Sequence, residues 1–129
     1  MTDVKELYLK GLGFYGQGKH ADAIQAFEEA VAADASRADC LQALAMAQMH
    51  AGKLQDALAN VLKLTEMTPE DPQAFTSLSM IYQRLDRIED AEKAQAKARM
   101  LSWKEELKTN PTAPPPVDSG GPGGMNVVQ

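Results

Sequence analysis

The sequence predicts an all-α protein built from three tandem helix-turn-helix repeats. The main observation is a period of 34 residues, because Asp22-Ala23 returns as Asp56-Ala57 and again as Asp90-Ala91. A fixed period of roughly 20 to 50 residues indicates a repeat array, in which no unit buries its apolar face alone. The second observation is that apolar residues recur at three-and-four spacing, whereas no segment alternates with period two over the length of a strand.

The first unit, residues 4–37, is expected to hold two helices joined at Gly18. Gly ends a helix in the left-handed conformation at little cost. Asp22 then places a negative charge in the first turn of the second helix, where it complements the helix dipole. In the first helix, Leu7 fills the space between the helices, and the small Gly11 lets them approach closely.

The second unit, residues 38–71, repeats this arrangement with Gly52 at the turn and Pro69 closing the unit. Each of its helices carries apolar residues on one face. These residues are Leu41, Leu44 and Ala45 on the first helix, and Leu54, Ala57, Leu58, Val61 and Leu64 on the second. The spacing therefore predicts a second helical pair.

The third unit, residues 72–105, has the small residue Ser79 where the first has Gly11. Its second helix is expected over residues 88–108, with polar residues at offsets that are apolar in the first unit. These polar residues are Glu92, Gln95 and Arg99. A terminal repeat needs a polar outer face, so this helix is predicted to end a six-helix array, with Trp103 folded back onto the third unit.

The residues at this period resemble the tetratricopeptide repeat, which combines large, small and aromatic residues at fixed offsets with a Gly turn and later Ala residues. They are Leu7, Gly11, Phe14, Gly18, Ala23, Phe27 and Ala30, then Leu41, Leu44, Ala45, Gly52, Ala57, Val61 and Leu64, then Phe75, Leu78, Ser79, Tyr82, Ala91 and Ala98. The resemblance covers residues 4–108 and implies a short right-handed superhelical array. The departures from the pattern are Lys10, Gln48, Asp86 and Gln95.

The domain organisation follows from a change of composition near residue 108. Residues 1–108 form the predicted repeat domain, and residues 109–129 contain five prolines and four glycines. Such a segment buries too little apolar surface to offset the entropy of ordering, so a disordered tail is expected. The tail ends in Met125–Gln129, which is either an unselected terminus or a short docking motif.

Charge and composition exclude several classes of protein. A net charge of −5 argues against a dedicated nucleic-acid-binding protein, which needs a clustered basic surface. The single cysteine, Cys40, has no partner for an internal disulfide. No secretory signal and no apolar run of transmembrane length is visible. We therefore expect a cytoplasmic protein that does not insert into membranes.

Two glycine motifs suggest nucleotide binding, but their context contradicts it. Gly11–Gly16 matches G-x-G-x-x-G, and Gly13–Lys19 matches G-x-x-x-x-G-K. Both motifs need a loop between a strand and a helix, whereas the residues before Gly11 have a helical period. His20 and His50 are the only histidines and are expected to lie apart, so no metal site follows from spacing. We predict no enzyme, no cofactor and no metal.

The resemblance to the repeat family implies a peptide-binding groove lined by the first helix of each unit. The groove residues that it implies are Tyr8, Leu12, Tyr15, Gln42, Met46, Met49, His50, Gln73, Thr76, Met80, Gln83 and Arg84. Methionine side chains adapt to different apolar ligands. The positions of the basic clamp that grips chaperone tails in part of the family do not match: they are Tyr8, Leu12, Ala43, Gln73 and Ser77.

The sequence thus predicts an adaptor that binds an apolar or amphipathic segment of another protein. The alternative is a structural subunit that self-assembles through its tail or its terminal helix. Light scattering over a concentration series separates the two, because only the second predicts oligomers that disappear when the tail is deleted.

Overall fold

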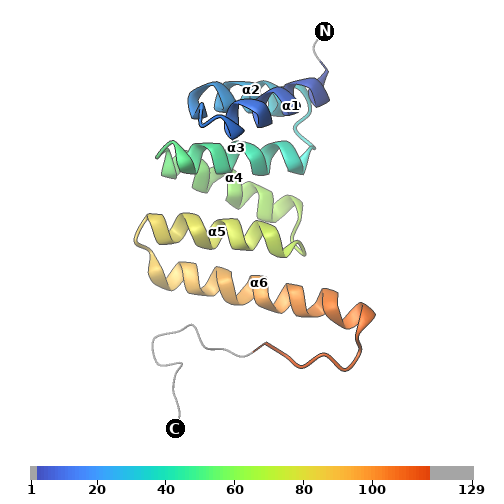
Figure 1. The fold of residues 1–129 in the computed structure, drawn as a ribbon. Coiled ribbons are helices and arrows are strands. Elements are labelled where there is room, and N and C mark those ends of the chain that lie inside the picture. Colours follow the sequence, from blue (N-terminus) through green and yellow to red (C-terminus); the bar gives the residue numbers. More distant parts are fainter. Residues whose placement is uncertain (1–2, 117–129) are drawn as a thin grey trace. The chain divides into compact units, whose positions relative to one another are not determined.

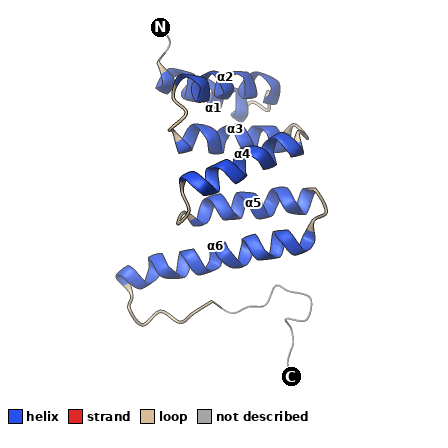
Figure 2. Cartoon of the chain, turned by 180° about the vertical axis from the view of Figure 1, so that it is seen from behind, coloured by secondary structure: helices blue, strands red, loops and turns tan. Residues whose placement is uncertain are grey.

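The computed structural model describes residues 3–116, and this part of the chain contains six α-helices and no strand (Figures 1 and 2). The helices are α1 (Val4–Gly16), α2 (His20–Ala33), α3 (Ala38–His50), α4 (Leu54–Met67), α5 (Pro72–Arg84) and α6 (Ile88–Thr109). They form three antiparallel pairs, so the prediction of an all-α protein with three helical repeats is confirmed. The chain divides into two compact units, Met1–Thr68 with α1 to α4 and Pro69–Gln129 with α5 and α6. A superhelical path through both units stays a prediction.

The turn inside each repeat closes with the same pair of backbone hydrogen bonds. The Gly18 N–H donates to the Tyr15 carbonyl at 3.0 Å, and the Lys19 N–H donates to the Phe14 carbonyl at 2.9 Å. Gly52 and Lys53 make the equivalent two bonds at the end of α3. This Schellman arrangement satisfies the last carbonyl groups of a helix and requires one residue with positive φ. The recurring Gly-Lys pairs were therefore correctly predicted to be turns.

The third turn uses the same hydrogen bonds without a glycine. Asp86 has a φ of 61°, and Gly18 and Gly52 have values of 77° and 84°. The Asp86 N–H donates to Gln83, and the Arg87 N–H donates to Tyr82 at 2.8 Å. A side chain in this left-handed region collides with the backbone, which costs free energy that Gly avoids. The departure of Asp86 from the repeat pattern therefore changes the stability of the turn, not its geometry.

Close approach of the two helices explains the small residues of the first helices. A Cβ atom added at Gly11 would overlap the ring of Phe27 on α2, which is completely buried. In the third repeat, the Ser79 hydroxyl donates to the Ala91 carbonyl at 2.9 Å in a buried position. The second repeat has Ala45, also completely buried, at the same place. The prediction that these positions allow close packing is confirmed at Gly11.

The core of the first unit is continuous because α2 contacts both α1 and α3, and α3 contacts α4. Leu7, Ala30 and Cys40 form a cluster at one end, with Tyr8 and Val31 packed against it. The predicted apolar stripes of α3 and α4 are also buried, except for Leu54, which is half-buried. One polar contact lies in this interface: Asn60 Nδ2 donates to Gln48 Oε1 at 2.8 Å, and Gln48 is 5% exposed. This hydrogen bond explains how Gln48 replaces the aromatic residue of the repeat pattern.

The last helix ends at Thr109, one residue beyond the predicted end, and no helix or strand follows over residues 110–116. These residues nevertheless contact α6, because Trp103 Nε1 donates to the Ala113 carbonyl at 3.0 Å. The indole thus bonds to the segment after α6. The sequence had instead predicted that Trp103 folds back onto the third repeat. The remainder of the predicted disordered tail, including Met125–Gln129, lies outside the described residues.

Two glycines of α1 give opposite predictions for stability. Gly11→Ala is expected to lower the free energy of unfolding by about 1–3 kcal/mol, because Phe27 fills the space that the new methyl group needs. Gly13→Ala is expected to raise it by about 0.5–1 kcal/mol, because a Cβ there meets no atom and helix interiors disfavour Gly. Urea unfolding of both variants tests this difference, and equal shifts would contradict the packing of Gly11 against Phe27.

Asp86→Gly is expected to raise the free energy of unfolding by about 0.5–1 kcal/mol, because it relieves the left-handed strain at this turn. The matched control is Gly52→Ala, which introduces a side chain at the same place in the second repeat and is expected to destabilise the protein. Thermal unfolding followed by circular dichroism measures both changes. A lower melting temperature for Asp86→Gly would show that the aspartate side chain stabilises its turn.

Candidate functional site

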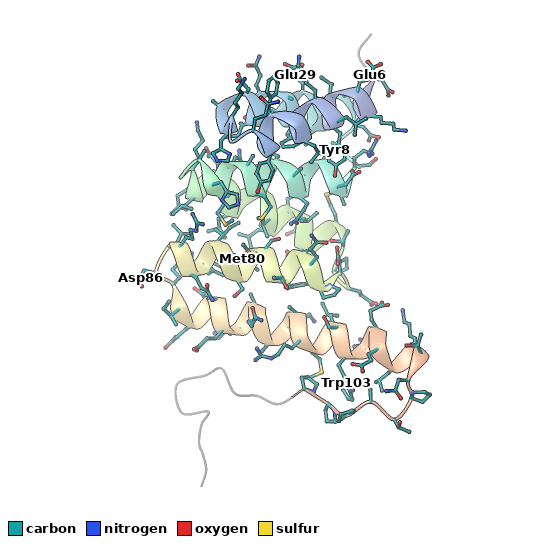
Figure 3. The ribbon with its side chains drawn as sticks, viewed as in Figure 1. Glu6, Tyr8, Glu29, Met80, Asp86 and Trp103 are labelled. Atoms are coloured by element: carbon teal, nitrogen blue, oxygen red, sulfur yellow. The ribbon has the colours of Figure 1, made fainter. Side chains whose placement is uncertain are left out.

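The first unit carries aromatic and apolar side chains along one face of α1. Tyr8, Leu12 and Tyr15 follow one another at steps of four and three residues, which places them on the same side of the helix. Leu12 is 39% exposed, and both tyrosines are half-buried. Figure 3 shows Tyr8 between α1 and α3. This face is therefore apolar and partly accessible to a ligand.

Helix α3 adds residues to this face, and it corrects one prediction. Gln42 and Met46 are half-buried, and His50 is exposed. Met49, which was predicted to line the groove, is 0% exposed. Leu41, Ala45 and Met49 lie four residues apart, so Met49 continues the buried stripe of α3. The prediction is therefore wrong for Met49.

We refer to the remaining residues of the first unit as the α1/α3 face. It consists of Tyr8, Leu12, Tyr15, Gln42, Met46 and His50. The first three come from α1 and the last three from α3, and these two helices contact each other directly. The structure therefore places six of the seven groove residues predicted in this unit on two helices in contact, and their role as a groove stays a prediction.

A cluster of three rings lies at one edge of the α1/α3 face. The ring centroids of His20 and His50 are 5.8 Å apart with planes inclined by 19°, and Tyr15 lies 5.9 Å from His20 and 5.7 Å from His50. The expectation that the two histidines lie apart is therefore wrong. The repeat topology explains their contact, because the α1–α2 turn and the end of α3 lie at the same edge of the unit. His20 and His50 are 30 residues apart, which differs from the period of 34, so the repeat pattern did not predict their contact.

The opposite edge of the face is charged. The Arg37 guanidinium lies 5.9 Å from the centre of the Tyr8 ring and pairs with Asp39 at 2.7 Å. The hydrogen bond from Arg37 lowers the pKa of the Asp39 carboxyl below its usual value. Burial raises the pKa of the Tyr8 phenol, and Asp39 and Cys40 raise it further, whereas Arg37 lowers it. Neutral Tyr8 is thus held between an ion pair and the core, and Arg37 is a site residue that the sequence prediction missed.

The second unit carries the other predicted groove residues on α5. Gln73, Thr76, Met80, Gln83 and Arg84 are all exposed, and Met80 is 40% exposed. Figure 3 shows Met80 on α5. The Thr76 hydroxyl is engaged within its own helix, where it donates to the Pro72 carbonyl at 3.1 Å. The α5 row therefore offers one large apolar side chain, Met80, among polar neighbours.

The structure also locates the groups that suggested catalysis. Gly11, Gly13 and Gly16 lie inside α1, so the two glycine motifs do not form a phosphate-binding loop. The Cys40 thiol is buried, and burial followed by the charge of Asp39 raises its pKa. A thiol with a raised pKa is a poor nucleophile. Among residues 3–116, no group of three or more metal-ligating side chains lies close together. None of the described helices is long and apolar enough to cross a membrane.

These features define a helical repeat protein that exposes an apolar face. The chain belongs to the tetratricopeptide repeat family, whose pattern it matches over residues 14–81. It is 25% identical over 113 residues to the photosystem I assembly protein Ycf3 of Synechococcus sp. (strain CC9605), a match that covers 81% of this chain and 65% of that protein. The chain thus spans slightly less than two thirds of this relative.

Two solved structures have the same fold. The type III secretion translocator chaperone SycD of Yersinia enterocolitica has a TM-score of 0.75 at 20% identity, over 84% of this chain and 83% of that one. PcrH, in complex with the chaperone binding region of PopB, has a TM-score of 0.76 at 22% identity, over 81% of this chain and 86% of that one. At this level of identity, the likeness supports the fold.

The raised pKa of Tyr8 predicts a specific loss of stability in alkali. Because the folded pKa lies above the unfolded one, the contribution of Tyr8 is complete below about pH 10 and is lost as the pH rises through the folded pKa. Tyr8→Phe removes the ionisation, so its free energy of unfolding is expected to fall less between about pH 8 and pH 11. Urea unfolding at both pH values measures this difference. The same decline in both proteins would contradict the burial of the phenol.

Proposed function

We propose that this protein is a non-catalytic adaptor whose α1/α3 face binds an apolar or amphipathic segment of another protein. The observation that carries the proposal is the set of large side chains left accessible on α1 and α3, although both helices have a complete packing face elsewhere. Leu12 is 39% exposed and Met46 is half-buried. A folded chain gains nothing by leaving such side chains in water, so a partner that covers them stabilises the complex.

The polar residues of the face support a ligand with few charges. Gln42 and His50 border the apolar centre, and Arg37 is already paired with Asp39. A highly charged ligand would lose hydration and find few free opposite charges in return. An amphipathic helix, or an extended segment with spaced apolar anchors, matches this arrangement of apolar centre and polar border.

The comparisons agree with a binding role. The solved structure of PcrH contains a segment of a second protein, PopB, and the relative from Synechococcus is described as an assembly protein. We extend this kind of role, and not these particular partners, to the present chain. The α5 row, with Met80 at its centre, provides a second contact surface in the other unit.

Self-assembly is the second candidate function. The observation that favours it is the exposure of apolar side chains on α6, where Ile88 is 47% exposed and Met100 is 45% exposed. A second copy could cover them, since isologous contacts join like surfaces. Light scattering of the full chain over a concentration series tests this function, and a constant mass contradicts it.

Met46→Glu is expected to abolish binding of a peptide selected from a random library against the native chain. The carboxylate would lie in the centre of the apolar contact, where its desolvation opposes binding. The matched control is Leu62→Glu, because Leu62 is 41% exposed but lies on α4, outside the α1/α3 face. Titration calorimetry measures the affinities, and circular dichroism confirms that both variants remain helical. Equal losses in the two variants would place the binding site elsewhere.

In the second unit, Met80→Glu is expected to weaken binding of a peptide selected against the α5 row, whereas Ile88→Glu on α6 is expected to leave the affinity of that peptide unchanged. The affinity should also change little between low and moderate salt, because apolar burial is not screened by ions. An affinity that falls by orders of magnitude with salt would show that charge pairs, not apolar contacts, hold the ligand.

A further inference from the structure

The segment after α6 makes a defined contact with the helix that it leaves. Trp103 Nε1 donates a hydrogen bond to the Ala113 carbonyl at 3.0 Å, and Ala113 is 5% exposed. Figure 3 shows Trp103 on the side of α6 that faces this segment. The chain turns at Pro111 and Thr112, so that three residues separate the end of the helix from Ala113. The next residues are Pro114-Pro115-Pro116. The proline-rich stretch therefore begins directly after the residue to which Trp103 donates its hydrogen bond.

Two of the three prolines border the same surface depression as the indole. The depression has a volume of about 260 Å³ and is lined by residues of α6, by Thr76 of α5, and by Pro114 and Pro116. The α6 residues are Gln95, Ala98, Arg99, Ser102, Trp103 and Glu106. Pro115 does not line the depression and is exposed. Pro114 is exposed as well and Pro116 is half-buried, so what distinguishes the two outer prolines from Pro115 is that they border the depression.

This arrangement has the chemistry of proline-rich recognition. Consecutive prolines adopt an extended helix whose carbonyl groups have no internal hydrogen bonds, and this helix is formed before binding. An indole supplies a flat apolar surface together with one N–H donor. The N–H of Trp103 reaches the carbonyl that precedes Pro114, and the indole borders the same depression as Pro114 and Pro116. Arg99 and Glu106, which have opposite charges, both line the depression. The surface therefore favours neither a positively nor a negatively charged ligand.

We propose that the Trp103 surface of α6 is a binding site for proline-rich segments of another protein, and that residues 110–116 occupy it as an internal ligand. The site is separate from the α1/α3 face, because it lies entirely in the second unit. Within the described residues, the segment is held to α6 by two hydrogen bonds, one from the Asn110 N–H to the Glu106 carbonyl and one from Trp103 to the Ala113 carbonyl, and by the buried methyl group of Ala113. A longer segment with prolines at the same alternate positions can therefore displace it.

Fluorescence of the full chain tests this proposal directly, because Trp103 is the only tryptophan. Ala113→Asp releases the internal ligand without altering α6, since a carboxylate is not accommodated at a buried position. The indole of this variant then becomes more exposed, so its emission shifts to longer wavelength relative to the native chain. A synthetic peptide of residues 110–116, Asn-Pro-Thr-Ala-Pro-Pro-Pro, is then titrated into the variant. Its binding should return the emission to the native wavelength.

Two further peptides serve as matched controls. Replacing Pro114 and Pro116 together by Ala is expected to weaken binding at least about tenfold, because both rings border the depression. Replacing Pro115 by Ala is expected to leave the affinity nearly unchanged, because this ring does not border the depression. The native chain should bind all three peptides more weakly than Ala113→Asp does, because its own segment competes for the site.

Three results would overturn the proposal. The first is an emission of Ala113→Asp that does not respond to the native peptide up to about 1 mM. The second is equal binding of the three peptides, which would mean that prolines are not recognised by position. The third is native emission that depends on protein concentration, which would make a second copy of this chain, and not a separate partner, the source of the ligand. Circular dichroism verifies that Ala113→Asp retains its helices.

Discussion

The ring of Phe27 occupies the space in which any residue other than Gly11 would place its Cβ atom. This contact fixes the distance between the two helices of the first repeat, and the turn at Gly18 fixes the direction in which the second helix returns. The same two constraints recur in the third repeat, where Ser79 bonds to Ala91 and Asp86 adopts the left-handed conformation. A helical pair with a short, defined turn and a close interface is rigid, and the functional surfaces depend on this rigidity.

The α1/α3 face and the Trp103 surface of α6 consist of side chains that the packing within the helical pairs leaves accessible. In α1, Leu7 and Gly11 are buried, whereas Leu12 stays exposed and the two tyrosines are only half-buried. In α6, Trp103 bonds to the segment after the helix, and Pro114 and Pro116 of this segment border the same depression as the indole. The two units thus present different chemistry: an aromatic and methionine-containing face in the first, and an indole with a proline ligand in the second.

The sequence predicted the helices and turns well, because the period of 34 residues relates each of them to two others. It predicted less well where residues break that period. His20 and His50 meet because of the repeat topology, yet their separation does not match the period. Met49 was assigned to the groove by family position, although its spacing from Leu41 and Ala45 places it on the buried stripe. The contact of Trp103 with Ala113 joins a helix to a segment without any period, so no pattern could reveal it.

The central claim is that the first unit binds an apolar protein segment on α1 and α3. The most direct measurement is site-specific photocrosslinking, with a photoreactive phenylalanine placed in the full chain at position 12 or, in a separate protein, at position 62. Both positions hold exposed leucines, and only the first belongs to the α1/α3 face. The account predicts that position 12 alone captures a partner from an extract of the source cells, and that the captured peptide is apolar or amphipathic. Equal capture at both positions, or a highly charged peptide at position 12, would contradict it.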